Sequence, residues 1–217
     1  MSLSTRLLAI AEFIKDNSTI ADIGTDHALL PIHLEQNKRA KKIIASDINS
    51  GPLKTAKKNI KEAGCTNIEI IESDGIDHIK DKVDYLVAAG MGGKLISDIL
   101  KHDNLKKISK LVLQPNVAAH ILRGSLSALG FKIVDEVLVE DGKVIYEIIY
   151  CEKGKQQLST DEIYFGPVLI KSKGVLFDTF YQKRRKKLRK IIKNVPQTNP
   201  NYKHLQNEID QINKVLK

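Results

Sequence analysis

The sequence of 217 residues contains few cysteines and few aromatic side chains: two cysteines, no tryptophan, and 5% aromatic residues in all. Cys65 and Cys151 are far apart in the chain, so neither a disulfide framework nor a metal site is predicted. No apolar run approaches the length of a membrane-spanning helix, and acidic residues interrupt the first 18 residues, unlike a signal peptide. We therefore expect a soluble, cytoplasmic protein without membrane association, and no segment indicates a protein partner.

The complete glycine motif of a dinucleotide site is also missing. The stretch IADIGTDHALL, residues 20–30, begins like a buried strand and ends like the start of a helix, but it contains the single glycine Gly24 followed by Thr25, Asp26 and His27. A pyrophosphate site would need G-x-G-x-x-G at this position, so a nucleotide-dependent oxidoreductase is disfavoured. The acidic turn favours a smaller, cationic ligand. The alternative is that Asp26 only caps the following helix.

The hydrophobic pattern predicts an α/β fold. An amphipathic helix is expected over residues 4–16, and β-branched apolar runs then recur at 19–23, 42–46, 68–72, 85–88 and 110–113, separated by segments with helical spacing. This alternation is typical of a mainly parallel sheet. The runs 131–140 and 144–151 flank Asp141-Gly142, a strong hairpin signal. The order resembles the Rossmann-like fold of class I S-adenosylmethionine-dependent methyltransferases, with an antiparallel last strand.

The C-terminal quarter differs from the rest in charge. Residues 171–217 hold 13 Lys and Arg against three acids, whereas residues 1–170 are almost neutral, with 22 Lys and Arg against 23 acids. Two helical segments flank the Pro196–Pro200 break, and Leu205, Ile209, Ile212 and Leu216 have coiled-coil spacing. We predict a catalytic domain with its connector over residues 1–170 and a basic helical hairpin over residues 171–217.

Acidic residues follow the first three predicted strands. Asp47 is placed to accept hydrogen bonds from ribose hydroxyls, and Asp74, before Gly75, to accept one from the amine of an adenine. The third acid is Asp26. Because parallel strands end at one edge of the sheet, we expect the three acids to lie together in an arrangement that fits an adenosine. For Asp47 by itself, a solvated turn is the alternative.

Two further loops follow the fourth and fifth strands. The glycine-rich AAGMGG, residues 88–93, gives a surface that flat groups can approach closely, or else a flexible turn before a helix. In VLQPN, Gln114 and Asn116 are candidates to hydrogen-bond the edge of a base, with Pro115 fixing the turn. Asn116 has the alternative role of a helix cap.

Together, ADIGTDHALLP, AAGMGG and VLQPN resemble the bacterial tRNA (adenine-22-N1)-methyltransferase family, as do the FGPVLI connector and the C-terminal hairpin. The resemblance implies S-adenosylmethionine as methyl donor and N1 of an adenine in the D arm of tRNA as acceptor. The resemblance implies that Gln114 and Asn116 face the base, and with Asp26 they are the predicted catalytic residues. The predicted cofactor-binding residues are Asp22, Gly24, Asp26, His27, Asp47, Ile48, Asp74, Gly75, Ala89, Gly90, Met91 and Gly92. The match identifies no general base; Asp26 is the first choice if one exists, and His27 the second.

The basic run KRRKKLRK, residues 183–190, fits a tRNA substrate, because lysines and arginines on a helix attract phosphates without reading sequence. The residues expected to bind nucleic acid are Lys183, Arg184, Arg185, Lys187 and Lys190. A solvated charged face is the alternative. At the level of the whole protein, the alternative to a tRNA methyltransferase is a catalytically inactive Rossmann-like RNA-binding protein.

Overall fold

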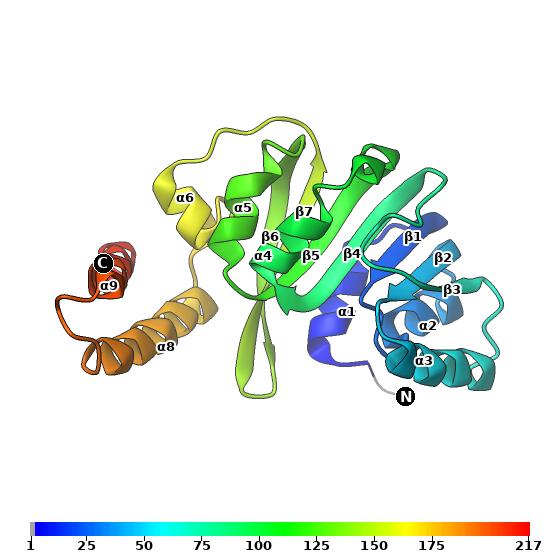
Figure 1. Ribbon diagram of the computed structural model, residues 1–217, viewed down its shortest axis with the longest axis horizontal. Helices are drawn as coiled ribbons and strands as arrows, with labels where there is room; N and C mark the ends of the chain where they lie inside the picture. Colours follow the sequence, from blue (N-terminus) through cyan, green and yellow to red (C-terminus); the bar gives the residue numbers. More distant parts are fainter. Residues whose placement is uncertain (1–2) are drawn as a thin grey trace.

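The computed structural model describes residues 3–217 and contains a seven-stranded sheet (Figure 1). The strand order is β3-β2-β1-β4-β5-β7-β6, parallel from β3 to β5 and antiparallel at β7 and β6. The strands are Ser18–Ile23 (β1), Ala40–Asp47 (β2), Ile68–Glu72 (β3), Val83–Gly92 (β4), Ile108–Val117 (β5), Phe131–Asp141 (β6) and Val144–Lys153 (β7). The Rossmann-like fold predicted from the sequence is confirmed.

Helices cover both faces of the sheet because its central strands are apolar on both sides. Ala21 and Leu86 pack towards α4 (Gly93–Ile99) and α5 (Ala119–Leu126). Ile20 and Tyr85, their neighbours in sequence, pack on the other face with α1 (Thr5–Glu12) and α2 (Leu29–Gln36). The helix α3 (Ser50–Glu62) packs beside α2 at the β3 end of the sheet. Within residues 3–217, no helix combines the length and apolarity needed to cross a membrane.

Two predicted features can be compared with the structure directly. The first helix spans Thr5–Glu12 rather than residues 4–16, because Phe13 is its C-cap and Asn17 adopts a left-handed φ of 59° just before β1. The hairpin at Asp141-Gly142 is present, with Asp141 paired to Val144 and Gly142 at φ 62°. In Figure 1 the tip of this β6–β7 hairpin projects past the ends of the other strands.

The C-terminal segment forms the expected helical hairpin of α8 (Val175–Ile192) and α9 (Pro200–Val215). Pro200 occupies the first turn of α9 and Asn199 caps it, so the Pro/Asn-rich break makes the turn. Ile209 and Ile212 are buried in the seam, together with Leu188. The connector contains the short helices α6 (Thr160–Phe165) and α7 (Leu169–Ser172), which the sequence pattern did not predict.

A hydrophobic cluster and a buried ion cluster attach this hairpin to the sheet. Phe165 and Leu169 of the connector share one apolar cluster with Phe177 and Tyr181 of α8. The connector thus packs on the hairpin as well as on the sheet. The predicted domain boundary at residue 170 therefore stays a prediction. The hydroxyl of Tyr181 also donates to the carbonyl of Phe165, at 3.4 Å.

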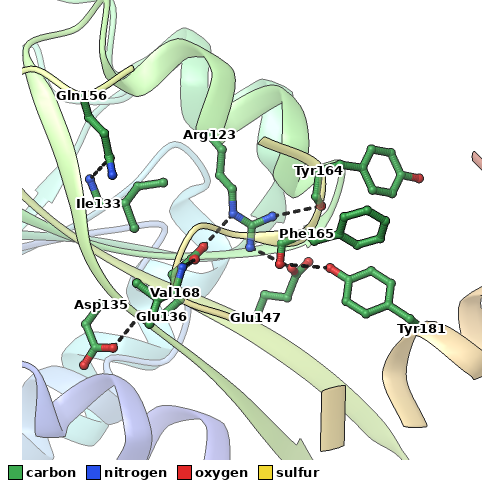
Figure 2. A network of polar contacts seen from close by, with 10 residues as sticks. All are labelled: Arg123, Ile133, Asp135, Glu136, Glu147, Gln156, Tyr164, Phe165, Val168 and Tyr181. Carbon is green, nitrogen blue, oxygen red and sulfur yellow. Dashed lines mark hydrogen bonds and ion pairs between the residues drawn. The ribbon is translucent and has the colours of Figure 1, made fainter. Parts of the chain in front are cut away.

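Arg123 lies at the centre of the ion cluster (Figure 2). Its Nε donates to Glu136 Oε1 at 2.6 Å and its Nη2 to Glu147 Oε1 at 2.8 Å, with the guanidinium fully buried. Burial opposes its charge, but the carboxylates of Glu147 and Glu136 outweigh that effect and raise the pKa of Arg123. Glu136 Oε2 accepts the N–H of Val168 at 3.0 Å, so the same cluster holds the connector.

Replacing Arg123 by Met should strongly destabilise the fold, because it leaves two carboxylates, one of them fully buried, without a cation. We expect the free energy of unfolding to fall by about 3–5 kcal/mol, measured by urea denaturation. Lys58→Met is the matched control, since it breaks an exposed ion pair with Glu62 on α3 and should change stability little. A destabilisation by Arg123→Met no larger than the control's would show that the cluster does not stabilise the fold.

Candidate cofactor and substrate site

A cavity of about 670 Å³ lies at the carboxyl ends of the parallel strands. It includes the point where β1 is flanked by β2 on one side and β4 on the other. Ligands of doubly wound folds bind at this kind of switch point. Most of the predicted site residues line the cavity: Asp22, Gly24, Asp26, His27, Asp47, Ile48, Asp74, Gly75, Ala89, Gly90, Met91 and Asn116.

The turn after β1 is held in an unusual backbone conformation. Gly24, Asp26 and Ala28 all have left-handed φ angles, of 71°, 52° and 57°. The N–H groups of Gly24 and Thr25 both donate to the carbonyl of Ser46, at 2.8 and 2.9 Å, which ties the turn to β2. The N-cap of α2 is Ala28, without a side-chain hydrogen bond, so the interpretation of Asp26 as a helix cap is wrong. The Asp26 side chain is exposed, 3.5 Å from His27 Nε2.

The ends of β2 and β3 join the same loop system. Asp47 accepts the N–H of Asn49 at 2.9 Å and, more weakly, that of Asp26 at 3.3 Å. Its carbonyl accepts the N–H of Ser73 at 3.0 Å, immediately before Asp74. These bonds bring the acids after β1, β2 and β3 around one cavity, as the sequence predicts.

Asp22 is the most electrostatically perturbed group of the cavity. Its carboxyl is almost completely buried, with 6% of the residue exposed. Burial raises the pKa of Asp22 to about 6, and the nearby Asp47 carboxylate adds to the increase. A cationic ligand group beside Asp22 would offset this cost, because an opposite charge favours the ionised carboxyl.

The ends of β4 and β5 are joined by a side-chain network centred on Gln114. Gln114 Oε1 accepts from the N–H of Gly90, at 3.1 Å, and from Arg6 Nη1. Its Nε2 donates to Asn116 Oδ1 at 3.0 Å, and Asn116 Nδ2 donates to the carbonyl of Gly90 at 2.7 Å. Asn116 lines the cavity, and α5 is capped by Ala118, so the capping role for Asn116 is wrong.

Gln114 itself does not fit the expectation that it faces a base. It is completely buried and does not line the cavity, because its amide is used by Arg6, Gly90 and Asn116. Gly92 also lies outside the cavity lining and is the N-cap of α4. The Gly93 that follows allows a close approach: a Cβ there would lie 2.3 Å from the carbonyl oxygen of Ala118.

Among the cavity residues that were not predicted from the sequence are Arg6 of α1 and Tyr146 of β7. The guanidinium carbon of Arg6 lies 5.3 Å from the centroid of the Tyr146 ring. Arg6 sits on the polar side of an ordinary amphipathic helix, and Tyr146 occupies an alternating position in the hairpin. Neither pattern distinguishes these residues from surface side chains, so no signal in the sequence could have identified them.

Comparison with known proteins assigns the family. A family model described as tRNA (adenine(22)-N(1))-methyltransferase matches residues 20–214. The Bacillus subtilis enzyme of that name is 36% identical over 187 residues, which cover 82% of this chain and 79% of that one. The chain belongs to the tRNA (adenine(22)-N(1))-methyltransferase family. This confirms the resemblance seen in the sequence motifs, and with it the expected activity and the use of S-adenosylmethionine.

Solved structures of similar proteins agree along the whole chain. A putative tRNA (m1A22) methyltransferase of Streptococcus pneumoniae, in complex with S-adenosyl-L-methionine, is 33% identical with a TM-score of 0.90. M. capricolum TrmK, in complex with S-adenosyl-homocysteine, is 33% identical with a TM-score of 0.88. Each comparison covers 100% of both chains, so the likeness includes the C-terminal hairpin as well as the sheet.

A second hollow, of about 430 Å³, lies on the exposed face of α8. We call it the basic groove; it is lined by Gln182, Arg185, Lys186, Arg189, Lys190 and Lys193. Of the residues expected to bind nucleic acid, it contains Arg185 and Lys190. Arg184 instead donates to Glu208 of α9 at 2.7 Å, and Lys183 lies 3.9 Å from Glu140. Lys186, Arg189 and Lys193 were missed, although their helical spacing places them on one face.

Asp22→Asn should stabilise the ligand-free protein at neutral pH. The raised pKa means that ionising Asp22 costs more in the folded than in the unfolded chain, so its destabilising effect grows as the pH rises from about 4 to above 6. At pH 7.5 we expect the variant to gain on the order of 2–3 kcal/mol in unfolding free energy. At about pH 3, where the carboxyl is mostly protonated in both the folded and the unfolded chain, the gain should vanish. Urea denaturation across this range checks it; a gain independent of pH would contradict the electrostatic cause.

Proposed function

We propose that the cavity is the site where this methyltransferase brings its methyl donor together with N1 of adenine 22 in tRNA. The observation that carries the proposal is that the acids after β1, β2 and β3 and the Gly90–Asn116 pair line the same cavity. One part of its wall is acidic, and another presents amide and backbone groups. This division suits a cationic donor beside a neutral heterocycle.

S-adenosylmethionine supplies an electrophilic methyl group on a positively charged sulfur. The chain's part is to bind the donor: we assign Asp47 to the ribose hydroxyls and Asp74 to the adenine amine. Asp22, Asp26 and His27 line the cavity near the turn after β1 and are assigned to the methionine portion. The positive φ of Gly24 lets the backbone approach the ligand. The other predicted cofactor-binding residues that line the cavity are Ile48, Gly75, Ala89, Gly90 and Met91. Gly92 does not line it, and we assign it to positioning the loop after β4, where it is the N-cap of α4.

On the acceptor side, N1 of adenine carries an in-plane lone pair, so it attacks a methyl group without prior deprotonation. Catalysis then depends mainly on alignment and on the electrostatic surroundings. We propose that Asn116 meets the base edge, since its amide is fixed by Gln114 and by the carbonyl of Gly90. Gln114 is a positioning residue. After transfer, the exposed carboxylate of Asp26 is the candidate to take a proton from the exocyclic amine of the cationic product.

Access to N1 imposes a further requirement on the tRNA. N1 lies on the Watson–Crick edge, which is hidden in a paired helix, so adenine 22 must leave the helix to enter the cavity. Contacts to the phosphates near the target can stabilise this opened form, and we assign them to the basic groove on α8. Because tRNA is its substrate, we also place the protein in the cytoplasm.

Incubation with labelled S-adenosylmethionine and unmodified tRNA tests the function directly. Nucleoside analysis should yield 1-methyladenosine and no N6-methyladenosine, and a tRNA with guanine at position 22 should remain unlabelled. Asp47→Ala should lose affinity for S-adenosylmethionine while its circular dichroism spectrum stays that of the parent. The absence of methylation by the parent chain, or methylation only at N6, would refute the proposal.

The basic groove should determine tRNA affinity and its salt dependence. Replacing Lys186, Arg189, Lys190 and Lys193 with Gln should weaken tRNA binding and make log affinity fall less steeply with log salt. The slope should decrease by up to about 0.9 for each phosphate that the variant no longer neutralises. Affinity for S-adenosylmethionine should not change.

The matched control removes the same charge elsewhere, by Lys54, Lys57, Lys58 and Lys61→Gln. These four exposed lysines lie on α3, at the opposite end of the molecule from α8 (Figure 1). The control should keep the parent's salt slope. Equal slopes for the two quadruple variants would show that overall charge, rather than the groove, attracts tRNA.

A further inference from the structure

Arg6 and Tyr146 form a cation–π pair on the wall of the cavity. They come from α1 and β7, elements that contribute none of the acids. Tyr146 is half-buried and, within the described chain, is the only Phe or Tyr that lines the cavity. The guanidinium carbon of Arg6 lies 5.3 Å from its ring centroid, within the range of a cation–π contact.

The pair is attached to the base-facing side of the cavity rather than to the acidic side. Arg6 Nη1 donates to Gln114 Oε1, the amide that also holds Gly90 and Asn116. A Cβ added at Gly90 would lie 3.8 Å from Arg6 Nη1, so the guanidinium lies close to the loop after β4. The hydrogen bond to Gln114 and the contact with Tyr146 therefore hold the guanidinium of Arg6 without any ligand, and Gln114 links it to Asn116.

We infer that Arg6 and Tyr146 form the surface on which adenine 22 stacks, with its Watson–Crick edge directed at Asn116. This inference rests on the proposed function and identifies its base-binding residues. A base that leaves a helix loses its stacking partners, and a protein that accepts it supplies aromatic rings or guanidinium planes instead. Arg6 is a guanidinium of this kind, linked to Asn116 through Gln114, and Tyr146 is the aromatic ring that it contacts. Because they are already ordered, little conformational entropy is lost when the base binds.

The substitution Tyr146→Ala removes the stacking surface and leaves the acidic wall intact. We expect kcat/KM for tRNA to fall roughly 5- to 150-fold, the range found when one base–aromatic stack is removed. The dissociation constant of S-adenosylmethionine, measured by calorimetry, should stay within about twofold of the parent's. Tyr146→Phe keeps the ring and should restore most of the activity. Arg6→Lys keeps the positive charge but removes the planar guanidinium, so it should also lower kcat/KM for tRNA.

Val144→Ala is the matched control, since Val144 is an exposed residue of the same strand and does not line the cavity. It should behave as the parent. A structural role for Tyr146 would lower the thermal midpoint and weaken donor binding together, which the stacking role does not. If the parent methylates adenine 22 but Tyr146→Ala leaves kcat/KM unchanged, or Phe fails to restore activity, the stacking inference is wrong and the function stands. If the parent itself does not methylate adenine 22, the proposed function fails.

Discussion

The buried amide of Gln114 joins three separate elements at the substrate end of the cavity. It accepts from Arg6 of α1 and from the backbone of Gly90 at the end of β4, and it donates to Asn116 at the end of β5. A buried amide is costly unless its hydrogen bonds are made, so the three partners keep one relative arrangement. In the proposed complex, Asn116 meets the edge of the base and Arg6 its face. Both roles depend on this one fully buried side chain.

Charge is distributed in two distinct places, and the fold keeps them apart. Several carboxylates line the cavity, where burial raises the pKa of Asp22. Four basic residues of α8 and the Lys193 that follows it line the basic groove on the surface of the hairpin: Arg185, Lys186, Arg189, Lys190 and Lys193. Arg123, held between Glu136 and Glu147, fixes the connector on which the hairpin packs. These contacts join the domain that contains the proposed donor site to the hairpin that contains the proposed phosphate site. Such an arrangement suits a substrate that must contact both sites.

Much of the fold could be predicted from the sequence, because its signals are local. Alternating apolar runs indicated the strands, Asp141-Gly142 indicated the hairpin, and the parallel strand order placed Asp47 and Asp74 at one edge. The direction of Gln114 could not be predicted in this way. The pairing of β4 with β5 shifts register between Ala89 and Met91, and such a shift changes which side chains face the cavity.

Contacts between residues far apart in the sequence could not be predicted from local patterns either. Arg6 meets Gln114 across 108 positions, and Arg123 meets Glu147 across 24, in each case between different elements. A charged residue in an amphipathic helix is normally solvated, so only the packed structure shows that Arg6 reaches a cavity and that Arg123 is buried. The short helices α6 and α7 were likewise missed, since each is too short to show a clear helical period.

An experimental structure of the chain with S-adenosyl-homocysteine and unmodified tRNA would test the proposed site most directly. We predict that the nucleoside of the cofactor lies between Asp47 and Asp74, and that adenine 22 lies outside its helix with N1 directed at the cofactor sulfur. The ring of adenine 22 should lie against Arg6 and Tyr146, and tRNA phosphates should follow the basic groove of α8. A complex with adenine 22 still stacked in the tRNA helix, or with the tRNA on the face away from this cavity, would contradict the proposed site.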